Sequence, residues 1–224
     1  MKWPLRVEFA DNIENITLTW NLENIPTQYN VFLYRGEKLV VENMRAVDSY
    51  TFEASAGSHD FRIVVGTVVP FTLSLTQGWN MISFPVLPDN ASPDAIFSGY
   101  YALYTWDAEN KRYVVYADRG DFVEPDPPIE AGVGYWAYVL ENENLNLLGD
   151  PVKRLTLSLR QGWYLIGTPY GGSNIADPAD NPDNSVLPWA FTWDAQERSY
   201  TMTQLLRAGR GYWAYAFRDC ELML

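Results

Sequence analysis

The chain contains an internal repeat, and this feature restricts its possible folds more than any other. Residues 71–79 (FTLSLTQGW) and 155–163 (LTLSLRQGW) agree at seven of nine positions and lie 84 residues apart. Residues 131–138 (AGVGYWAY) and 208–215 (AGRGYWAY) agree at seven of eight positions and lie 77 residues apart. A chain with this self-similarity is expected to form one structural unit twice.

A third repeated block lies between these two, and the spacing around it differs between the copies. YTWDA at 104–108 matches FTWDA at 191–195, 87 residues later. The offset then falls from 87 to 77, because the first copy has ten extra residues within its acidic, proline-rich segment 118–130. Blocks that persist while spacers change length are typical of strands joined by surface loops. We therefore expect two copies of a β-strand repeat, 69–150 and 151–224, packed as a pseudo-symmetric pair.

The local patterns within each copy predict strands and hairpins. TLSL alternates polar and apolar residues before a Gln-Gly turn, and the apolar strand that follows ends at Pro85 or Pro169. Segments 104–116 and 191–202 each place a polar turn between two strand-like runs, which is typical of a hairpin. In the first copy only residues 91–97 show helix signals, with Ser-Pro-Asp at the start.

The residues before the repeat predict a separate domain, 1–68. Six or seven short strand-like runs recur there at intervals of about 8–12 residues, the spacing expected of a β-sandwich. Ile16, Leu18 and Trp20 alternate onto one face of such a strand. The predicted fold class is all-β: a small N-terminal immunoglobulin- or fibronectin-like sandwich followed by the two repeat copies.

Two stretches resemble known modules. ITLTW, SYTFEA and DFRIVVG together resemble the fibronectin type III-like sandwich of large secreted bacterial proteins. QGWNMISFP, YTWDAENKRY and AGVGYWAY resemble the GWN…GYW repeat modules of secreted and cell-surface bacterial proteins. The second copy departs from that pattern, with Tyr164 in place of the Asn of GWN and Gly167 in place of Ser83. The resemblance implies a non-catalytic extracellular module and supplies no catalytic residues.

Composition excludes several classes of function. The chain has 224 residues and a formal net charge of −12, so its surface repels nucleic acid and anionic lipid. No apolar run reaches the 18 or so residues that a membrane span needs, so no membrane insertion is expected. The single cysteine, Cys220, excludes an internal disulfide, and the single histidine, His59, removes most metal and acid–base chemistry.

Carboxylates leave two alternatives open. A glycosidase needs only a pair of them, but Asp107 and Asp194 occupy equivalent hairpin turns, where capping of the turn is the simpler explanation. We therefore expect no enzyme. The acidic segments 118–126 and 174–184 are rich in the oxygen ligands of calcium but lack EF-hand spacing, so calcium remains a second hypothesis and no cofactor is expected.

Aromatic residues are the remaining indication of function, since sugar-binding modules stack pyranose rings on exposed tryptophan and tyrosine. Repeated tryptophans are expected in the core, because each copy must fill the same space. These are Trp79, Trp106, Trp136, Trp163, Trp193 and Trp213. The predicted binding residues are aromatic and polar residues near the loops: Trp189, Tyr170, Tyr101, Phe122, Asp177, Asp180 and Asn184.

These patterns predict a non-catalytic accessory region of a secreted or cell-surface bacterial protein. The start of the sequence lacks an apolar signal segment, which leaves two alternatives, a cytoplasmic protein or a piece of a secreted precursor, and we expect the second. We expect it to be part of a larger polypeptide and to bind polysaccharide. The alternative is a structural or adhesion module that mediates protein–protein or cell-surface assembly, with a cell-surface protein as its partner.

Overall fold

The computed structural model describes residues 1–36, 38–99, 101–118 and 127–224. The prediction of an all-β protein is confirmed, because antiparallel sheets account for nearly all of its regular structure. The chain divides into two compact units, Met1–Val69 and Pro70–Leu224, and both repeat copies lie in the second.

The first unit consists of two sheets around one core. The larger sheet has the strand order β1-β6-β3-β4, and β2 pairs with β5 in the smaller one. Phe52, Phe61 and Leu33 are buried between them. The Trp20 indole N–H lies at the edge of this core and donates to the carbonyl oxygens of Met44 and Val47, at 2.8 and 3.0 Å. The strands are β1 (Lys2–Phe9), β2 (Ile13–Thr19), β3 (Asn30–Arg35), β4 (Lys38–Val41), β5 (Ser49–Ala54) and β6 (Gly57–Gly66).

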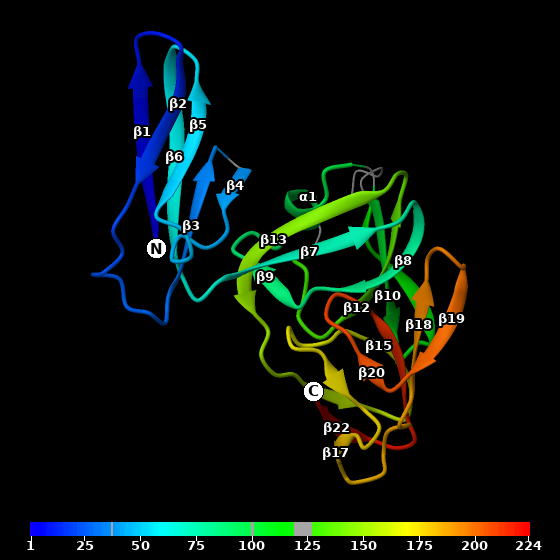
Figure 1. Ribbon diagram of the computed structural model, residues 1–224. Coiled ribbons are helices and arrows are strands. Elements are labelled where there is room, and N and C mark those ends of the chain that lie inside the picture. Colours follow the sequence, from blue (N-terminus) through cyan, green and yellow to red (C-terminus); the bar gives the residue numbers. More distant parts are fainter. Residues whose placement is uncertain (37, 100, 119–126) are drawn as a thin grey trace. The chain divides into compact units, whose positions relative to one another are not determined.

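The first repeat copy forms a four-stranded sheet and a three-stranded sheet. The orders are β11-β10-β12-β8 and β7-β13-β9 (Figure 1). A single-turn helix, α1 (Pro93–Ile96), forms within the segment predicted to be helical, and the predicted hairpin is β10–β11. The strands are β7 (Val69–Leu75), β8 (Gly78–Ser83), β9 (Val86–Pro88), β10 (Tyr101–Asp107), β11 (Arg112–Asp118), β12 (Gly134–Val139) and β13 (Glu143–Pro151).

The second copy has the same strand orders, β19-β18-β21-β15 and β14-β22-β17, plus the short pair β16–β20. Strand β22 occupies the place that β13 has in the first copy, and β21 that of β12. The strands are β14 (Thr156–Leu159), β15 (Gly162–Ile166), β16 (Ser173–Asn174), β17 (Ala179–Asn181), β18 (Ala190–Asp194), β19 (Ser199–Thr203), β20 (Leu205–Leu206), β21 (Tyr212–Ala216) and β22 (Cys220–Met223).

Each copy has its own core, and each core contains the tyrosine of that copy's Gly-x-Gly-Tyr-Trp block. Tyr135 and Tyr212, the tyrosines of the two Gly-x-Gly-Tyr-Trp blocks, are almost completely buried. Their hydroxyl oxygens accept hydrogen bonds from the backbone N–H of Glu130 and Arg207, at 3.0 and 2.8 Å. A buried hydroxyl needs such a partner, so these bonds explain why the two blocks have tyrosine rather than phenylalanine at this position.

Backbone hydrogen bonds join the two copies in matching pairs. Ser83 N–H donates to the carbonyl of Gly209 at 3.0 Å, and Gly167 N–H donates to the carbonyl of Gly132 at 2.8 Å. The second bond is the first with the two copies exchanged, since Ser83 corresponds to Gly167 and Gly132 to Gly209 in the repeat. Strand β8 also contacts β18, and β15 contacts both β10 and β12, so the two larger sheets lie side by side (Figure 1).

Gly167 is small because it packs directly against its counterpart in the first copy. A Cβ atom at Gly167 would lie 2.8 Å from the Cβ of Ser83 and 2.9 Å from the carbonyl oxygen of Val133. Two side chains do not fit between the backbones at this point. The serine of one copy therefore faces the glycine of the other, which explains the departure of the second copy from the repeat pattern.

Candidate ligand-binding site

The repeated tryptophans lie outside the core, contrary to the sequence-based expectation. Side chains alternate across a strand, and in β12 Tyr135 and Ala137 point into the core while Trp136 and Tyr138 point away and are partly exposed. Trp79 and Trp163 are 43% and 41% exposed. The pattern Tyr-Trp-Ala-Tyr therefore supplies one aromatic residue to the core and two to the outer face of the sheet.

Strand register brings these outer aromatic residues together as cross-strand pairs. Tyr104 lies opposite Trp136, and Trp106 lies opposite Tyr113. The second copy repeats both pairs, with Phe191 opposite Trp213 and Trp193 opposite Tyr200. Directly opposite residues have neighbouring side chains, so each sheet presents a continuous aromatic outer face.

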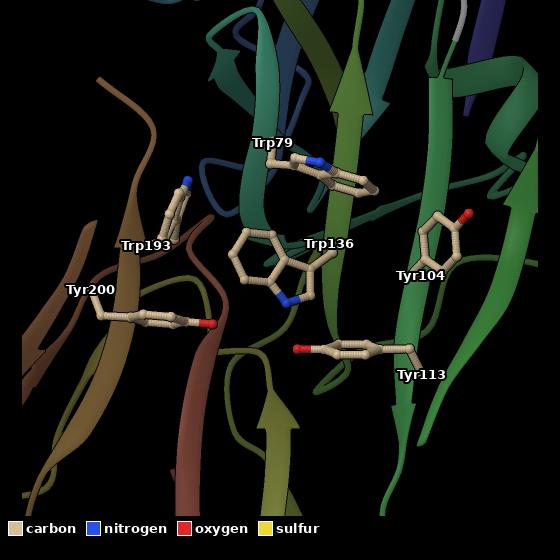
Figure 2. A pocket seen from close by; sticks show the side chains of 6 residues that line it. All are labelled: Trp79, Tyr104, Tyr113, Trp136, Trp193 and Tyr200. Atoms are coloured by element: carbon tan, nitrogen blue, oxygen red, sulfur yellow. The ribbon is translucent and has the colours of Figure 1, made fainter. Parts of the chain in front are cut away.

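Aromatic residues of both copies line a first aromatic pocket of about 440 Å³. Figure 2 shows the Trp136 ring in the middle, with the other rings placed around it. Trp79 meets Trp136 at 90° and Tyr200 meets it at 88°, with ring centroids 6.2 and 6.3 Å away. Trp79 and Tyr200 therefore stand nearly perpendicular to Trp136. We call Trp136 the floor ring of this pocket and the rings beside it the walls. The lining residues are Trp79, Tyr104, Tyr113, Trp136, Trp193 and Tyr200.

A second aromatic pocket, of about 500 Å³, has the same design. Trp163 meets the floor ring Trp213 at 90°, and Trp106 meets it at 83°. Exchange of the two repeat copies converts the lining of one pocket into the lining of the other, position by position. One position differs in chemistry, because Phe191 stands where the first pocket has Tyr104. The lining residues are Trp106, Tyr113, Trp163, Phe191, Tyr200 and Trp213.

Tyr113 and Tyr200 belong to both pockets. They are counterparts in the repeat, and their hydroxyl groups point toward one another in Figure 2. Partial burial raises the pKa of Tyr113, and the neighbouring Tyr200 raises it further. The Tyr113 hydroxyl is therefore protonated at neutral pH and can donate as well as accept a hydrogen bond at the wall that separates the pockets.

Polar contacts between the copies support the second pocket. The Trp106 indole N–H donates to the carbonyl oxygen of Trp163 at 2.9 Å. This bond fixes the Trp106 ring against strand β15, which carries the Trp163 side chain. Glu109 and Arg160 form an exposed ion pair at 3.3 Å. An exposed pair of this kind contributes little to stability, so the aromatic contacts and backbone hydrogen bonds hold the copies together.

A third, more polar pocket of about 310 Å³ adjoins the first. Trp193 lines both of them, and Asp194, Gln196 and Arg210 also line the polar one. These side chains offer hydrogen-bond donors and acceptors beside an aromatic wall.

The two predicted loop aromatics are exposed but lie apart from this site. Trp189 is 38% exposed and Tyr170 is 39% exposed, and neither lines either aromatic pocket. Tyr170 makes an edge contact with Phe71 of the first copy, with centroids 6.2 Å apart. The structure does not bring Trp189 and Tyr170 together with the aromatic pockets.

The expectation for Tyr101 is wrong. Its side chain is completely buried and its ring stacks on Phe97, with centroids 4.5 Å apart. The hydroxyl donates to Asp94 Oδ1 at 2.9 Å. The alternation within β10 directs Tyr101 to the core and Tyr104 to the outer face. Phe122 lies outside the described residues.

The predicted polar residues organise their own loop. Asp180 Oδ2 accepts hydrogen bonds from the backbone N–H groups of Ser185 and Val186, at 3.0 and 2.7 Å. Asn184 is exposed and donates to the carboxylate of the adjacent Asp183, and Asp177 is also exposed. Within the described ranges no group of three or more His, Cys, Asp or Glu side chains could hold a metal ion.

The four residues considered above for catalysis, Asp107, Asp194, His59 and Cys220, make contacts within the fold. Asp107 accepts a hydrogen bond from the backbone N–H of Asn110, and Asp194 from those of Gln196 and Glu197, so the predicted turn capping is confirmed. His59 contacts Arg35 and the carbonyl of Ser55. Cys220 belongs to the core of the second copy, and burial raises the pKa of its thiol.

Comparison of the chain with protein-family models, with curated proteins and with solved structures finds no match. The resemblance to fibronectin type III-like and GWN…GYW modules therefore stays a prediction. In the part of the chain that the structure describes, no helix has the length and apolar character to cross a membrane.

The aromatic pockets are absent from the sequence-based predictions, although the sequence contains a signal for them. In Gly-Tyr-Trp-Ala-Tyr-Val the strand period places Tyr, Ala and Val on one face and Trp and Tyr on the other. The Tyr, Ala and Val side chains can fill the core by themselves, so the tryptophan lies on the opposite, outer face of the sheet.

Proposed function

We propose that this chain is a non-catalytic, polysaccharide-binding region of a secreted or cell-surface bacterial protein. The observation that carries the proposal is the pair of aromatic pockets between the repeat copies. Their volumes, about 440 and 500 Å³, fall within the range of roughly 300–1,000 Å³ that is usual for small-ligand sites.

The chemistry of the pocket walls suits sugar rings. A pyranose has faces covered by C–H groups, which pack against the π surface of tryptophan or tyrosine. The tyrosine hydroxyls at the shared wall, and the polar groups of the adjoining pocket, can bond the hydroxyls at the edge of such a ring. Exposed clusters of large apolar side chains usually mark binding surfaces, and here Trp79, Trp163 and Tyr200 remain between 41% and 51% exposed.

The alternative function is a structural or adhesion module that binds protein. One observation favours it: the pocket linings are aromatic throughout, with few polar groups of their own. Aromatic-lined grooves bind proline-rich segments in the polyproline II conformation. The two functions use the same surface, so the ligand distinguishes them.

The deciding experiment is a binding screen on soluble and insoluble glycans, followed by titration of tryptophan fluorescence. We expect Trp79→Ala and Trp163→Ala together to abolish saturable binding, because they remove one wall from each pocket. Trp189→Ala is the matched control, since Trp189 is similarly exposed but lies outside both pockets.

Loss of binding in Trp189→Ala alone would move the site to the loops and contradict the proposed location. If no glycan binds and a proline-rich peptide does, the adhesion function replaces the proposed one. Melting temperatures of all variants show whether each one is folded.

A further inference from the structure

The relation between the two copies determines how many ligands one molecule can hold. Each aromatic pocket takes side chains from both copies, and exchange of the copies interchanges the pockets. If a translation related the two copies, exchange of the copies would not interchange the pockets, because one of the pockets would lack side chains from the second copy. An exchange that returns each copy to its starting place after two steps is a twofold rotation.

Two contacts lie where such an axis must pass. A residue meets its own counterpart only on the axis of a twofold pair. Ser83 packs against its counterpart Gly167, and the hydroxyl groups of Tyr113 and its counterpart Tyr200 point toward one another within the wall that the pockets share (Figure 2). Contacts away from the axis occur in reciprocal pairs, as a twofold relation requires: Trp136–Trp193 at 5.5 Å is matched by Trp213–Trp106 at 5.2 Å.

The angles between the rings determine what each pocket can hold. An extended chain of sugars needs several rings facing the same way along a track. Around Trp136 the neighbouring rings instead stand at 90°, 88° and 67°, and around Trp213 they stand at 90°, 83° and 74°. The rings beside each floor ring therefore stand at steep angles to it and do not form a flat track along which an extended glycan could stack (Figure 2).

We infer that the chain carries two equivalent aromatic boxes, each of which holds one terminal or branch sugar, so that one protein molecule holds two glycan ends. This inference rests on the proposed function and specifies the valence of the site and the part of the glycan that it recognises. Tyr113 and Tyr200 serve both boxes as a common wall.

The test is calorimetry with two probes of different length, the disaccharide and the hexasaccharide of β-1,4-linked glucose, mannose or N-acetylglucosamine. For the series that binds, we expect two sites per chain with both probes. We also expect dissociation constants within about threefold of one another, since only the terminal ring enters a box. One site per chain, or an affinity that rises tenfold or more with length, would overturn the inference.

Matched variants locate the two boxes. Trp79→Ala should leave one site, Trp163→Ala should leave the other, and Tyr113→Ala should weaken both. Trp189→Ala should retain two sites. If Trp79→Ala and Trp163→Ala each abolish all binding, the pockets form one composite site and the inference is wrong. Absence of binding by wild-type protein to every saccharide would instead contradict the proposed function itself.

Discussion

Asp107 and Asp194 show how one carboxylate can organise a hairpin turn. Each ends a strand, and each accepts backbone N–H groups from the residues that follow: Asn110 at 3.0 Å in the first copy, and Gln196 and Glu197 at 2.9 and 3.0 Å in the second. These bonds favour the ionised form, and they hold the pKa of both carboxyl groups below its usual value.

The lowered pKa values predict a specific response to acid. A carboxyl group with a lower pKa in the folded state contributes stability above its unfolded-state pKa of about 4, and this contribution disappears as the pH falls through the folded-state pKa. We expect the melting temperature of wild-type protein to fall across this window. The double variant Asp107→Asn, Asp194→Asn should show a smaller fall.

The measurement is a series of thermal melts between pH 2 and 7, with Asp177→Asn as the control for loss of an exposed charge. Asparagine retains the side-chain oxygen that caps the turn, so the fold should survive. Parallel pH profiles for wild type and the double variant would contradict the assigned role.

At the scale of the strand, each repeated block combines several functions in consecutive residues. In β10 and β18, the threonines Thr105 and Thr192 donate to the carbonyl oxygens of Gly134 and Gly211, at 3.1 and 2.9 Å. The next residue is a tryptophan that lines a pocket, and the next is the aspartate of the turn. The block Thr-Trp-Asp therefore joins neighbouring strands, forms the site and closes the hairpin.

Strand positions could be predicted from the sequence, because the alternation and turn residues are local signals. The face of the sheet on which a tryptophan lies could not be predicted. It depends on which of the two alternating sets of apolar residues in the strand fills the core. The roles of Asn80 and Tyr164 were also beyond prediction. Asn80 Oδ1 accepts the N–H of Thr76 at 3.0 Å, and the Tyr164 hydroxyl oxygen accepts the N–H of the equivalent Arg160 at 2.7 Å, so two different side chains make the same bond.

The contact between equivalent strands predicts a large effect of one methyl group. Gly167→Ala should destabilise the protein by about 1–3 kcal/mol, because its Cβ would overlap Ser83 and the carbonyl of Val133. Gly171→Ala is the matched control, since a Cβ there meets no atom within 4 Å; it should be neutral or stabilising by up to about 1 kcal/mol. Urea unfolding measures both, and equal midpoints for the two variants would contradict the close approach.

At the scale of the whole second unit, each copy has its own core, but part of the outer face of each copy is covered by the other copy. The aromatic outer face of one copy packs partly against the other, and the exchanged bonds at Gly132 and Gly209 satisfy backbone groups across the boundary. A copy separated from its partner would expose this face and leave those backbone groups unpaired.

Separate expression of residues 153–224 should therefore give a fragment that self-associates. Twofold pairing of two identical fragments would restore much of the lost contact. Light scattering after gel filtration measures its mass, with residues 70–224, which contain both copies, as the control. A fragment that stays monomeric, with the same melting temperature as the control, would show that the copies do not depend on each other.

The covalent link between the copies has a consequence for specialisation. In a dimer of identical chains, every substitution in a pocket would alter both pockets at once. Here four of the six lining residues of each pocket belong to that pocket alone, and Phe191 already removes from the second pocket the hydroxyl that Tyr104 gives to the first. A substitution at one of these unshared positions can thus change one pocket and leave the lining of the other intact, whereas a substitution at Tyr113 or Tyr200 changes both.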